Sequence, residues 1–347
     1  KQTTERRISA AARIALVAAL CVANIVLLLA LGFFLQTHAA YIYLLLEALG
    51  LILVVRVQNQ AGSPSYKLAW TIVILALPAA GMAMYALWGG NTQRKRHTAA
   101  GVPLPPHKDY ERSRSTDYLE RMEESFPTWV RTARYLVKHD FMIYKNTRVT
   151  YFPDGEAFFA DLITRLEKAE HFIFLEYFIL AEGKLWDQVF AALRDRASRG
   201  VEIKILFDDF GNITRMSGEM IDAMKECGME VIIFNPVHQY VNRLYFNYRD
   251  HRKICCIDGD FAYTGGINIA DEYANIIHRF GHWRDCGVCL EGEGAWGLTR
   301  QFIHMWQWQQ GTLQNEYDYY RPHGPVQAEG WCQPFVDGPL NNPEDPA

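Results

Sequence analysis

The chain has 347 residues, half of them hydrophobic, which suffices for two domains or one large domain with a sizeable core. Its net charge of −4 is unevenly divided: residues 1–97 hold nine Lys/Arg and two Asp/Glu, which leaves 26 basic and 37 acidic residues in the remainder, a balance of −11. So acidic a domain is a poor electrostatic partner for nucleic acid, and we expect no nucleic-acid ligand.

Three apolar runs at the start predict a membrane region over residues 1–97, with spans at about 14–35, 39–57 and 68–90. About 20 apolar residues cross a bilayer as a helix. A cleavable signal peptide is the competing interpretation of the first run, but its apolar core would have only ~7–15 residues. Glu47 lies inside the second run, and a carboxylate in hydrocarbon is costly unless it is paired. We therefore expect either two or three transmembrane helices.

Basic residues flank all of these runs, so the positive-inside rule gives a divided answer on orientation. With two spans, both basic ends lie in the cytoplasm; with three, the large remaining domain lies outside. We expect a multi-pass membrane protein, and the cytoplasmic side is slightly favoured for the large domain. The cluster "RKRH" at 94–97 is either a binding site for anionic lipid head groups or a plain stop-transfer flank.

Residues 98–140 are predicted to form a polar linker and an amphipathic helix, which runs from about Tyr118 to His139 and restarts near Pro127. Residues 141–330 then alternate between helical and strand patterns. The helical segments are "EAFFADLITRLEKAE", "LWDQVFAALRDRASRG" and a third ending near Gly228, and the strands are "HFIFLEYFIL", "VEIKILF" and "MEVIIF". This alternation predicts an α/β fold with a mixed, largely parallel sheet flanked by helices.

The segment "DHRKICCIDGDFAYTGGIN", residues 250–268, follows these units. Asp258 and Gly259 separate two strand patterns, and an Asp-Gly pair is a strong hairpin signal. His251 and Lys253 have the same parity, so their side chains should project from one face. A neutral imidazole can attack phosphorus while an ammonium and an amide hold the phosphate oxygens, although a strand with a surface histidine and lysine is common in proteins without such a role.

The seven cysteines give little indication of function. Their odd number does not suit a disulfide framework. Cys286 and Cys289 have CxxC spacing, but in a strand these positions point to opposite faces, and no second Cys/His pair completes a zinc site. We expect no metal, and the role of this pair stays open.

The complete spacing of HxK, four residues, Asp, six residues and GGxN resembles the motif of the phospholipase D superfamily. Its elements are His251, Lys253, Asp258, Gly265, Gly266 and Asn268. The apolar runs and the segments "LEYFIL", "ILFDDFGN", "GGINIADEY", "HWRDCGVCLEG" and "FIHMWQW", in this order, resemble the bacterial cardiolipin synthases of that superfamily. The resemblance implies that residues 141–330 form the first phospholipase-D-like half of such an enzyme.

That resemblance implies a phosphatidyl transfer in which two phosphatidylglycerol molecules give cardiolipin and glycerol without a cofactor. His251 becomes the nucleophile that forms a phosphohistidine, and Lys253 and Asn268 bind the phosphate beside Gly265 and Gly266. Asp258 either fixes local structure, which is favoured, or touches substrate.

The other ring nitrogen of His251 needs an acceptor. Asp285 is the first candidate and Glu272 the second, with an ion pair to Arg284 or Arg249 as the purely structural alternative for either. Water must also be kept from the intermediate. Five aromatic residues could line a pocket that does so, although for each one a place in the core is the favoured interpretation: Tyr177, Phe178, Phe210, Tyr245 and Phe246.

Members of the superfamily carry two HxK motifs, whereas this sequence shows one. Residues 331–347 include "WCQPFVDGPL", which is similar to "VTYFPDGEAF" at 149–158, so we expect the start of a second repeat whose own motif is missing here. A homodimer that pairs two copies of His251 is the alternative. Two other functions stay open, a phospholipase D-type hydrolase or nuclease and a non-catalytic membrane-anchored module, and the acidic balance disfavours the nuclease.

Overall fold

The computed structural model describes residues 18–27, 29–30, 32–33, 38–60, 64–89, 104–236, 249–310, 317–324 and 326–338. The chain divides into two compact units. The first comprises Lys1–Ala99, Pro236–Tyr248 and Asn342–Ala347, and the second comprises Ala100–Asn235 and Arg249–Asn341. The apolar runs therefore fall in the first unit, and the motif residues fall in the second.

The first unit contains apolar helices, of which the longest are α2 (Ala39–Gln58), α3 (Pro64–Ala76) and α4 (Pro78–Trp88). Within the described residues, one helix, Ala40–Gln58, is long and apolar enough to cross a membrane, while Ala18–Leu27 and Tyr66–Ala76 are shorter. The second predicted span therefore agrees with α2. The first predicted span lies partly outside the described residues.

The third predicted span, at about 68–90, is wrong as a single helix. Leu77 leaves the helical conformation, with φ −135° and ψ 71°, and Pro78 starts α4. Proline has no N–H to continue the helical ladder and clashes with the preceding turn, so the helix ends before it and a new one begins. The apolar run thus forms two short helices.

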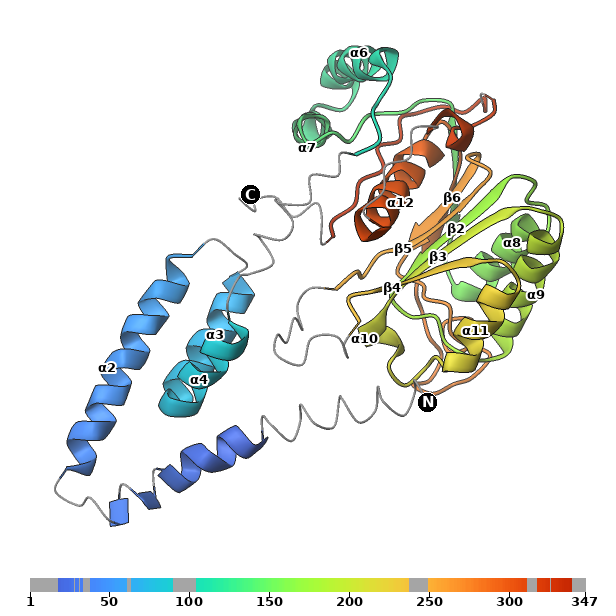
Figure 1. The fold of residues 1–347 in the computed structure, drawn as a ribbon. Helices are drawn as coiled ribbons and strands as arrows, with labels where there is room; N and C mark the ends of the chain where they lie inside the picture. The colour runs from blue at the N-terminus through green and yellow to red at the C-terminus, as the bar shows by residue number, and fades with distance from the viewer. Residues whose placement is uncertain are drawn as a thin grey trace. The chain divides into compact units, whose positions relative to one another are not determined.

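The second unit is built on one sheet of seven strands in the order β1-β7-β6-β5-β2-β3-β4 (Figure 1). The strands are β1 (Thr147–Phe152), β2 (Phe172–Tyr177), β3 (Glu202–Asp208), β4 (Glu230–Phe234), β5 (Lys253–Ile257), β6 (Phe261–Gly265) and β7 (Gly287–Gly292). The helices are α6 (Asp109–Ser125), α7 (Pro127–Lys138), α8 (Gly155–Leu166), α9 (Lys184–Ser198), α10 (Asp209–Asn212), α11 (Gly218–Glu226) and α12 (Ala295–Gln310), with the 3₁₀ turn η2 (Tyr317–Tyr320).

The prediction of a mixed sheet flanked by helices is confirmed, but the prediction that it is largely parallel is wrong. Only β2–β3 and β3–β4 pair in parallel, whereas the other four pairings are antiparallel. Helical crossovers join β2, β3 and β4, as parallel strands require. β5 and β6 are joined instead by the turn at Asp258 and Gly259, with φ values of 53° and 74°. Such a tight turn forces its strands to run antiparallel.

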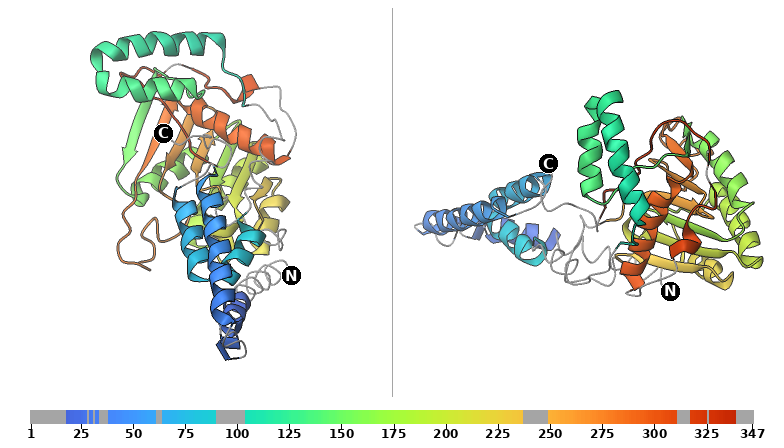
Figure 2. Two further views of the ribbon diagram at one scale, coloured as in Figure 1. Left: turned by 90° about the vertical axis from the view of Figure 1, so that its left-hand side faces the viewer. Right: turned by 90° about the horizontal axis from the view of Figure 1, so that it is seen from above.

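Helices cover both faces of this sheet. α8, α9 and α11 lie on one face and α12 on the other, as Figures 1 and 2 show. The alternation of side chains explains the two layers, because Ile173, Leu175 and Tyr177 of β2 join the core under α8 and α9. Phe174 of the same strand points to the other face and stacks on Phe302 of α12 at 4.6 Å.

The predicted amphipathic helix is observed as two helices, α6 and α7, which pack against each other (Figure 2). The break predicted at Pro127 is confirmed, since Phe126 is non-helical with φ −141° and ψ 59°. The helical part begins at Asp109, nine residues earlier than predicted. The inner side of the pair includes Leu119, Val130 and Ala133, which pack on Ile143.

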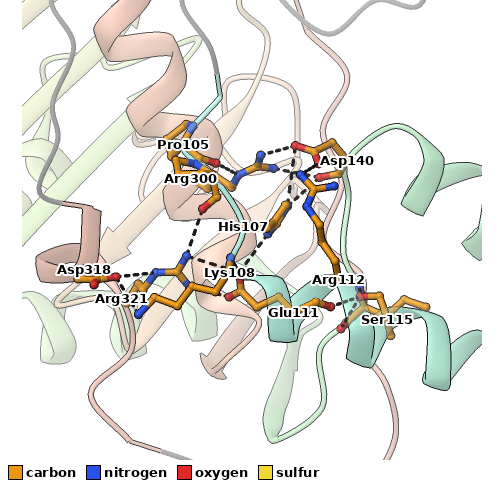
Figure 3. Close-up of polar contacts among 12 residues, drawn as sticks. Pro105, His107, Lys108, Glu111, Arg112, Ser115, Asp140, Arg300, Asp318 and Arg321 are labelled. Carbon is orange, nitrogen blue, oxygen red and sulfur yellow. Dashed lines mark hydrogen bonds and ion pairs between the residues drawn. The ribbon is translucent and has the colours of Figure 1, made fainter.

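A buried polar cluster connects α6 to α12 (Figure 3). Arg300 of α12 pairs with Asp140, whose backbone oxygen also accepts from it at 2.9 Å. His107 contacts the carboxylate of Glu111 at 3.3 Å, and Arg321 pairs with the same carboxylate at 2.6 Å. Burial acts to raise the pKa of Glu111, but the hydrogen bonds from His107 and Arg321 outweigh it and lower that pKa to about 2. The cluster holds the segment before α6 against α12.

Residues 331–338 extend along the second unit. Cys332 forms a bridge with Tyr144 through reciprocal backbone bonds of 2.7 and 2.8 Å. The Gln333 side chain donates to the carbonyls of Ala133 and Phe141. The predicted start of a second repeat stays a prediction, because residues 339–347 lie outside the described part of the chain.

Candidate active site

The motif residues other than Asp258 lie at one edge of the sheet, at the ends of the strands. Lys253, the first residue of β5, lies opposite Tyr177, the last residue of β2. Gly265 ends β6 and lies opposite Gly287, which begins β7. The carboxyl ends of the parallel strands β2 and β3 open at this same edge, which in α/β sheets is the usual position of a ligand.

The predicted pair, His251 and Lys253, stands where the chain enters β5. The ring of Phe178 lies 4.7 Å from the imidazole, centroid to centroid, and 5.5 Å from the Lys253 ammonium. Lys253 is buried and donates to the carbonyl oxygen of His251 at 2.5 Å. Both side chains therefore contact the same aromatic ring, which is consistent with the prediction that they project from one face.

Both groups have shifted pKa values. Burial of part of the ring, together with the nearby ammonium, lowers the pKa of His251. Burial lowers the pKa of Lys253 to about 8. A desolvated cation loses charge more readily than one in water, and a desolvated imidazole favours its neutral form. At neutral pH the pair therefore presents an unprotonated ring beside a mostly charged ammonium.

Asn268 is held by its neighbours in one orientation. Its Oδ1 accepts from the backbone N–H of Ile179 at 3.0 Å, and its Nδ2 donates to the Tyr273 hydroxyl at 2.9 Å. An amide carries two N–H bonds on Nδ2, so the second is available for a ligand. Sequence reasoning missed Tyr273, whose only signal was its position within "GGINIADEY".

The glycine pair lets other groups approach closely. A Cβ on Gly265, which has φ 153°, would come within 2.4 Å of the Cys286 carbonyl oxygen. A Cβ on Gly266 would come within 2.1 Å of the Asp285 carboxylate. The bare Cα of Gly266 thus allows Asp285 to lie against the motif, where its charge acts to raise the pKa of Lys253.

The two predicted partners of the His251 ring differ in position. Asp285 lies beside the motif, as its contact with Gly266 demonstrates. Glu272 is instead engaged by Arg215, with 2.5 Å between Oε1 and Nη1. The ion pair left open by the sequence does form, but its partner is Arg215 rather than Arg284 or Arg249. In the described part of the chain, no carboxylate is hydrogen-bonded to the His251 ring.

Asp258 occupies the turn between β5 and β6, far along the strand from the motif histidine. Its Oδ1 accepts from the backbone N–H groups of His171 and Phe172, and its Oδ2 accepts from that of Glu170. These three bonds of 2.8–2.9 Å tie the turn to the start of β2. The contacts are those of a residue that fixes local structure.

A buried set of charges, which the sequence analysis did not predict, lies behind the histidine. Asp250 and Arg252, on either side of the histidine, pair at 3.0 Å. The guanidinium also contacts the carboxylate of Glu176, which is fully buried. Burial raises the pKa of Glu176 well above its usual value. For Asp250, the neighbouring Arg252 outweighs burial and lowers the pKa.

Asp208, at the end of β3, holds the same segment from the other side. Its carboxylate accepts from the backbone N–H of Asp250 at 2.9 Å and contacts Arg249 at 3.3 Å. Burial raises the pKa of Asp208 to about 6. Because side chains of β2 and β3 hold residues 249–252, the backbone that carries the histidine is firmly placed.

The five aromatic residues predicted as pocket or core separate into groups. Tyr177 belongs to the core. Phe178 contacts the motif, and Phe210 is exposed, with the Arg249 guanidinium 5.0 Å from its ring. Tyr245 and Phe246 lie outside the described residues.

Cys286 and Cys289 differ in exposure, as expected for two positions predicted to point to opposite faces of a strand. Cys286 is exposed and Cys289 is buried. Burial raises the pKa of the Cys289 thiol to about 12, so this sulfur is an inert core group.

The arrangement has the components for attack on a phosphodiester. A neutral ring nitrogen can displace an alcohol from phosphorus. The Lys253 ammonium and the free N–H of Asn268 can hold the phosphate oxygens in fixed positions, which stabilises charge without reorganisation.

Comparison with known proteins gives matches for both units. Residues 162–281 match the family described as "Cardiolipin synthase, PLD-like domain", and residues 41–90 match the family described as "Phospholipase_D-nuclease N-terminal". Among solved structures, Nuc of Salmonella typhimurium, a phospholipase D family member, is 19% identical with a TM-score of 0.33, covering 47% of this chain and 93% of that one.

Curated relatives extend the match over most of the chain. An uncharacterized protein of Streptococcus mutans is 35% identical over 284 residues, which cover 79% of this chain and 60% of that protein. A cardiolipin synthase of Geobacillus kaustophilus is 30% identical over 301 residues, or 83% of this chain and 57% of that protein. One of Alkalihalophilus pseudofirmus is 29% identical over 282 residues, or 80% and 55%. The chain thus spans little more than half the length of these relatives.

Proposed function

Because this chain belongs to the phospholipase D superfamily and is similar to cardiolipin synthases, we propose that it takes part in a phosphatidyl transfer. Two phosphatidylglycerol molecules would give cardiolipin and free glycerol. The observation that supports the proposal is the contact of His251 and Lys253 with the ring of Phe178, next to Ile179, whose backbone N–H holds the Asn268 amide.

In the first step, a ring nitrogen of His251 attacks the phosphorus of one phosphatidylglycerol. A P–N bond forms, the P–O bond to glycerol breaks, and the leaving alkoxide takes a proton. In the second step, the terminal hydroxyl of another phosphatidylglycerol attacks the phosphohistidine and releases a proton, the new P–O bond forms, and the imidazole leaves. One phosphodiester replaces another, so neither ATP nor a cofactor is consumed.

The other motif residues take roles that suit their contacts. Lys253 and Asn268 bind the phosphate oxygens, and the backbone at Gly265 and Gly266 lets the phosphate approach. Asp285 orients the ring by accepting from its second nitrogen once substrate is bound. Asp258 stabilises the strand pairing that carries the motif.

The proton for the leaving glycerol requires a further group, since the nucleophile cannot also supply it. We propose a second HxK motif, carried either by the same protein beyond this chain or by another copy in a homodimer. The matched relatives are considerably longer than the aligned part, which supports the first of these. Purification of the intact protein with determination of its mass in detergent distinguishes the two.

A lipid substrate and the apolar helix α2 support a membrane location for this activity. We propose the bacterial cell membrane, with anionic lipids around the basic flank at 94–97. The transfer is tested by reconstituting the intact protein with phosphatidylglycerol alone. Cardiolipin and glycerol should appear in equal amounts, and the His251→Ala variant should form neither. An absolute requirement for a CDP-activated lipid would refute the proposal.

Phospholipase D-type hydrolysis is the second candidate, because the His251 residue is exposed to water. In that case, reconstituted protein would release phosphatidic acid without cardiolipin. A labelling experiment distinguishes either enzyme from a non-catalytic module. The protein is exposed briefly to phosphatidylglycerol that carries a label on its phosphorus. An acid-labile label on wild-type protein that is missing from His251→Ala indicates catalysis, whereas its absence from both indicates a module that only binds.

A further inference from the structure

The helices α3 and α4 of the first unit form an antiparallel hairpin. The hydroxyl of Tyr66, near the start of α3, donates to the carbonyl of Gly89, just past the end of α4, at 2.9 Å. Between them, the rings of Trp70 and Tyr85 meet edge to face at 5.2 Å. The two outer ends are therefore adjacent, and the turn at Leu77 is the tip.

The close approach of the two helices depends on a glycine. A Cβ on Gly81 would lie 2.4 Å from the carbonyl oxygen of Val73 and 2.8 Å from the Cα of Ile74. Small residues let membrane helices pack backbone to backbone in this way. The hairpin is thus a packed unit rather than a kinked single span.

The hairpin is too short to cross a bilayer. α3 has 13 residues and α4 has 11, which correspond to about 20 and 16 Å, against a hydrocarbon thickness of about 30 Å. The contacts of the hairpin with α2 also show that its tip reaches only to about the middle of α2. Gln58, at the end of α2, donates to Thr71, whereas Ile74, near the tip, lies in van der Waals reach of Gly50. Gly50 stands near the middle of the 20-residue α2.

One backbone N–H group at the tip of the hairpin is satisfied by a side chain from another segment. The first N–H groups of a helix have no partner within the helix, and in hydrocarbon each such group is costly. The N–H of Ala80 donates to Oδ1 of Asn24 at 3.2 Å, and Asn24 is only 4% exposed. Asn24 lies at the centre of the apolar run 14–35. A turn in the aqueous interface would be hydrated by water and would need no such partner.

Two independent depth markers thus place the tip near the middle of an apolar segment of the sequence: Gly50 in α2 and Asn24 in the run 14–35. We propose that α3 and α4 form a re-entrant hairpin that enters and leaves the same leaflet of the bilayer. Its partner is the acyl region of that leaflet, which would cover the exposed apolar side chains Leu68, Ile72, Leu75 and Leu87.

The proposal determines on which side the second unit emerges. A re-entrant hairpin does not change sides, so the segment between α2 and α3 and the segment after α4 lie on the same membrane face. Arg56 and Lys67 then share that face with the basic cluster at 94–96. By the positive-inside rule this face is cytoplasmic, which resolves the divided answer obtained from three full spans.

The topology is tested in the intact protein with a recognition site for a sequence-specific protease, inserted after Asn59 in one variant and after Ala100 in another. Sealed inside-out and right-side-out vesicles are then treated with the protease. Both sites should be cut only in inside-out vesicles. Cleavage of the two sites in opposite kinds of vesicle would overturn the proposal.

The hairpin packing has its own test. Gly81→Leu should lower the melting temperature of the intact protein in detergent, because a side chain there meets the Val73 carbonyl. Gly32→Leu is the matched control, since a Cβ at Gly32 meets nothing within 4 Å. In a single continuous span, leucine would be favoured over glycine at both positions. Equal effects of the two substitutions would therefore contradict the hairpin.

Discussion

Asp258 allows a structural role to be separated from a catalytic one. Its carboxylate accepts three backbone hydrogen bonds, two on Oδ1 and one on Oδ2. Each bond contributes about 1–1.5 kcal/mol net, so Asp258→Ala should lower the free energy of unfolding by about 3–4 kcal/mol. Alanine also tolerates the φ of 53° poorly, which adds to the loss.

Asp258→Asn gives a graded comparison. Asparagine accepts the left-handed conformation and keeps one oxygen, so it should lose one of the three bonds and about 1–2 kcal/mol. Glu170→Gln is the matched control, because it removes an exposed charge nearby while its backbone N–H remains. The alanine variant should melt roughly 10 °C below wild type.

The assay combines thermal unfolding of the purified protein with turnover of phosphatidylglycerol per folded molecule at a temperature below every transition. A structural Asp258 predicts the order Ala below Asn below wild type in melting temperature, with turnover of the folded fraction nearly unchanged. Wild-type stability of Asp258→Asn together with a loss of turnover greater than about tenfold would show instead that the carboxylate acts on substrate.

Three further predictions concern charge and packing. Turnover should follow a bell-shaped pH profile. It should fall at acid pH, below the lowered pKa of His251, as the ring is protonated, and above about pH 8 as Lys253 loses its proton. Replacement of this lysine by arginine should shift only the alkaline limb to higher pH. Gly266→Ala should lower turnover at least tenfold because its Cβ displaces the adjacent carboxylate, whereas Gly324→Ala, which meets nothing within 4 Å, should have no effect; equal turnover would refute the contact. Glu111, with its pKa lowered to about 2, stabilises the fold above its unfolded pKa of about 4.3, so stability should decline from about pH 5 towards pH 2 in acid unfolding, and Glu111→Gln should reduce that decline.

Local features of the chain followed from the sequence. Asp258 and Gly259 predicted the turn, Pro127 predicted the break between two helices, and the spacing of His251 and Lys253 predicted their shared neighbourhood. These features depend on backbone dihedrals and side-chain parity, which a few consecutive residues determine. The hairpin also places Lys253, which starts β5, beside the end of β6 at Gly265, because a hairpin brings its two ends together.

The tertiary structure decided the features that join distant segments. Glu272 pairs with Arg215 rather than with the arginines considered from the sequence, and Asn24 caps a helix that begins 54 residues later at Pro78. The direction of the later strands and the packing of α3 against α4 as a hairpin also depend on tertiary contacts. In each case several segments of similar chemistry could have been the neighbour. The packing of the entire unit, rather than any short stretch of chain, determines which of them is near.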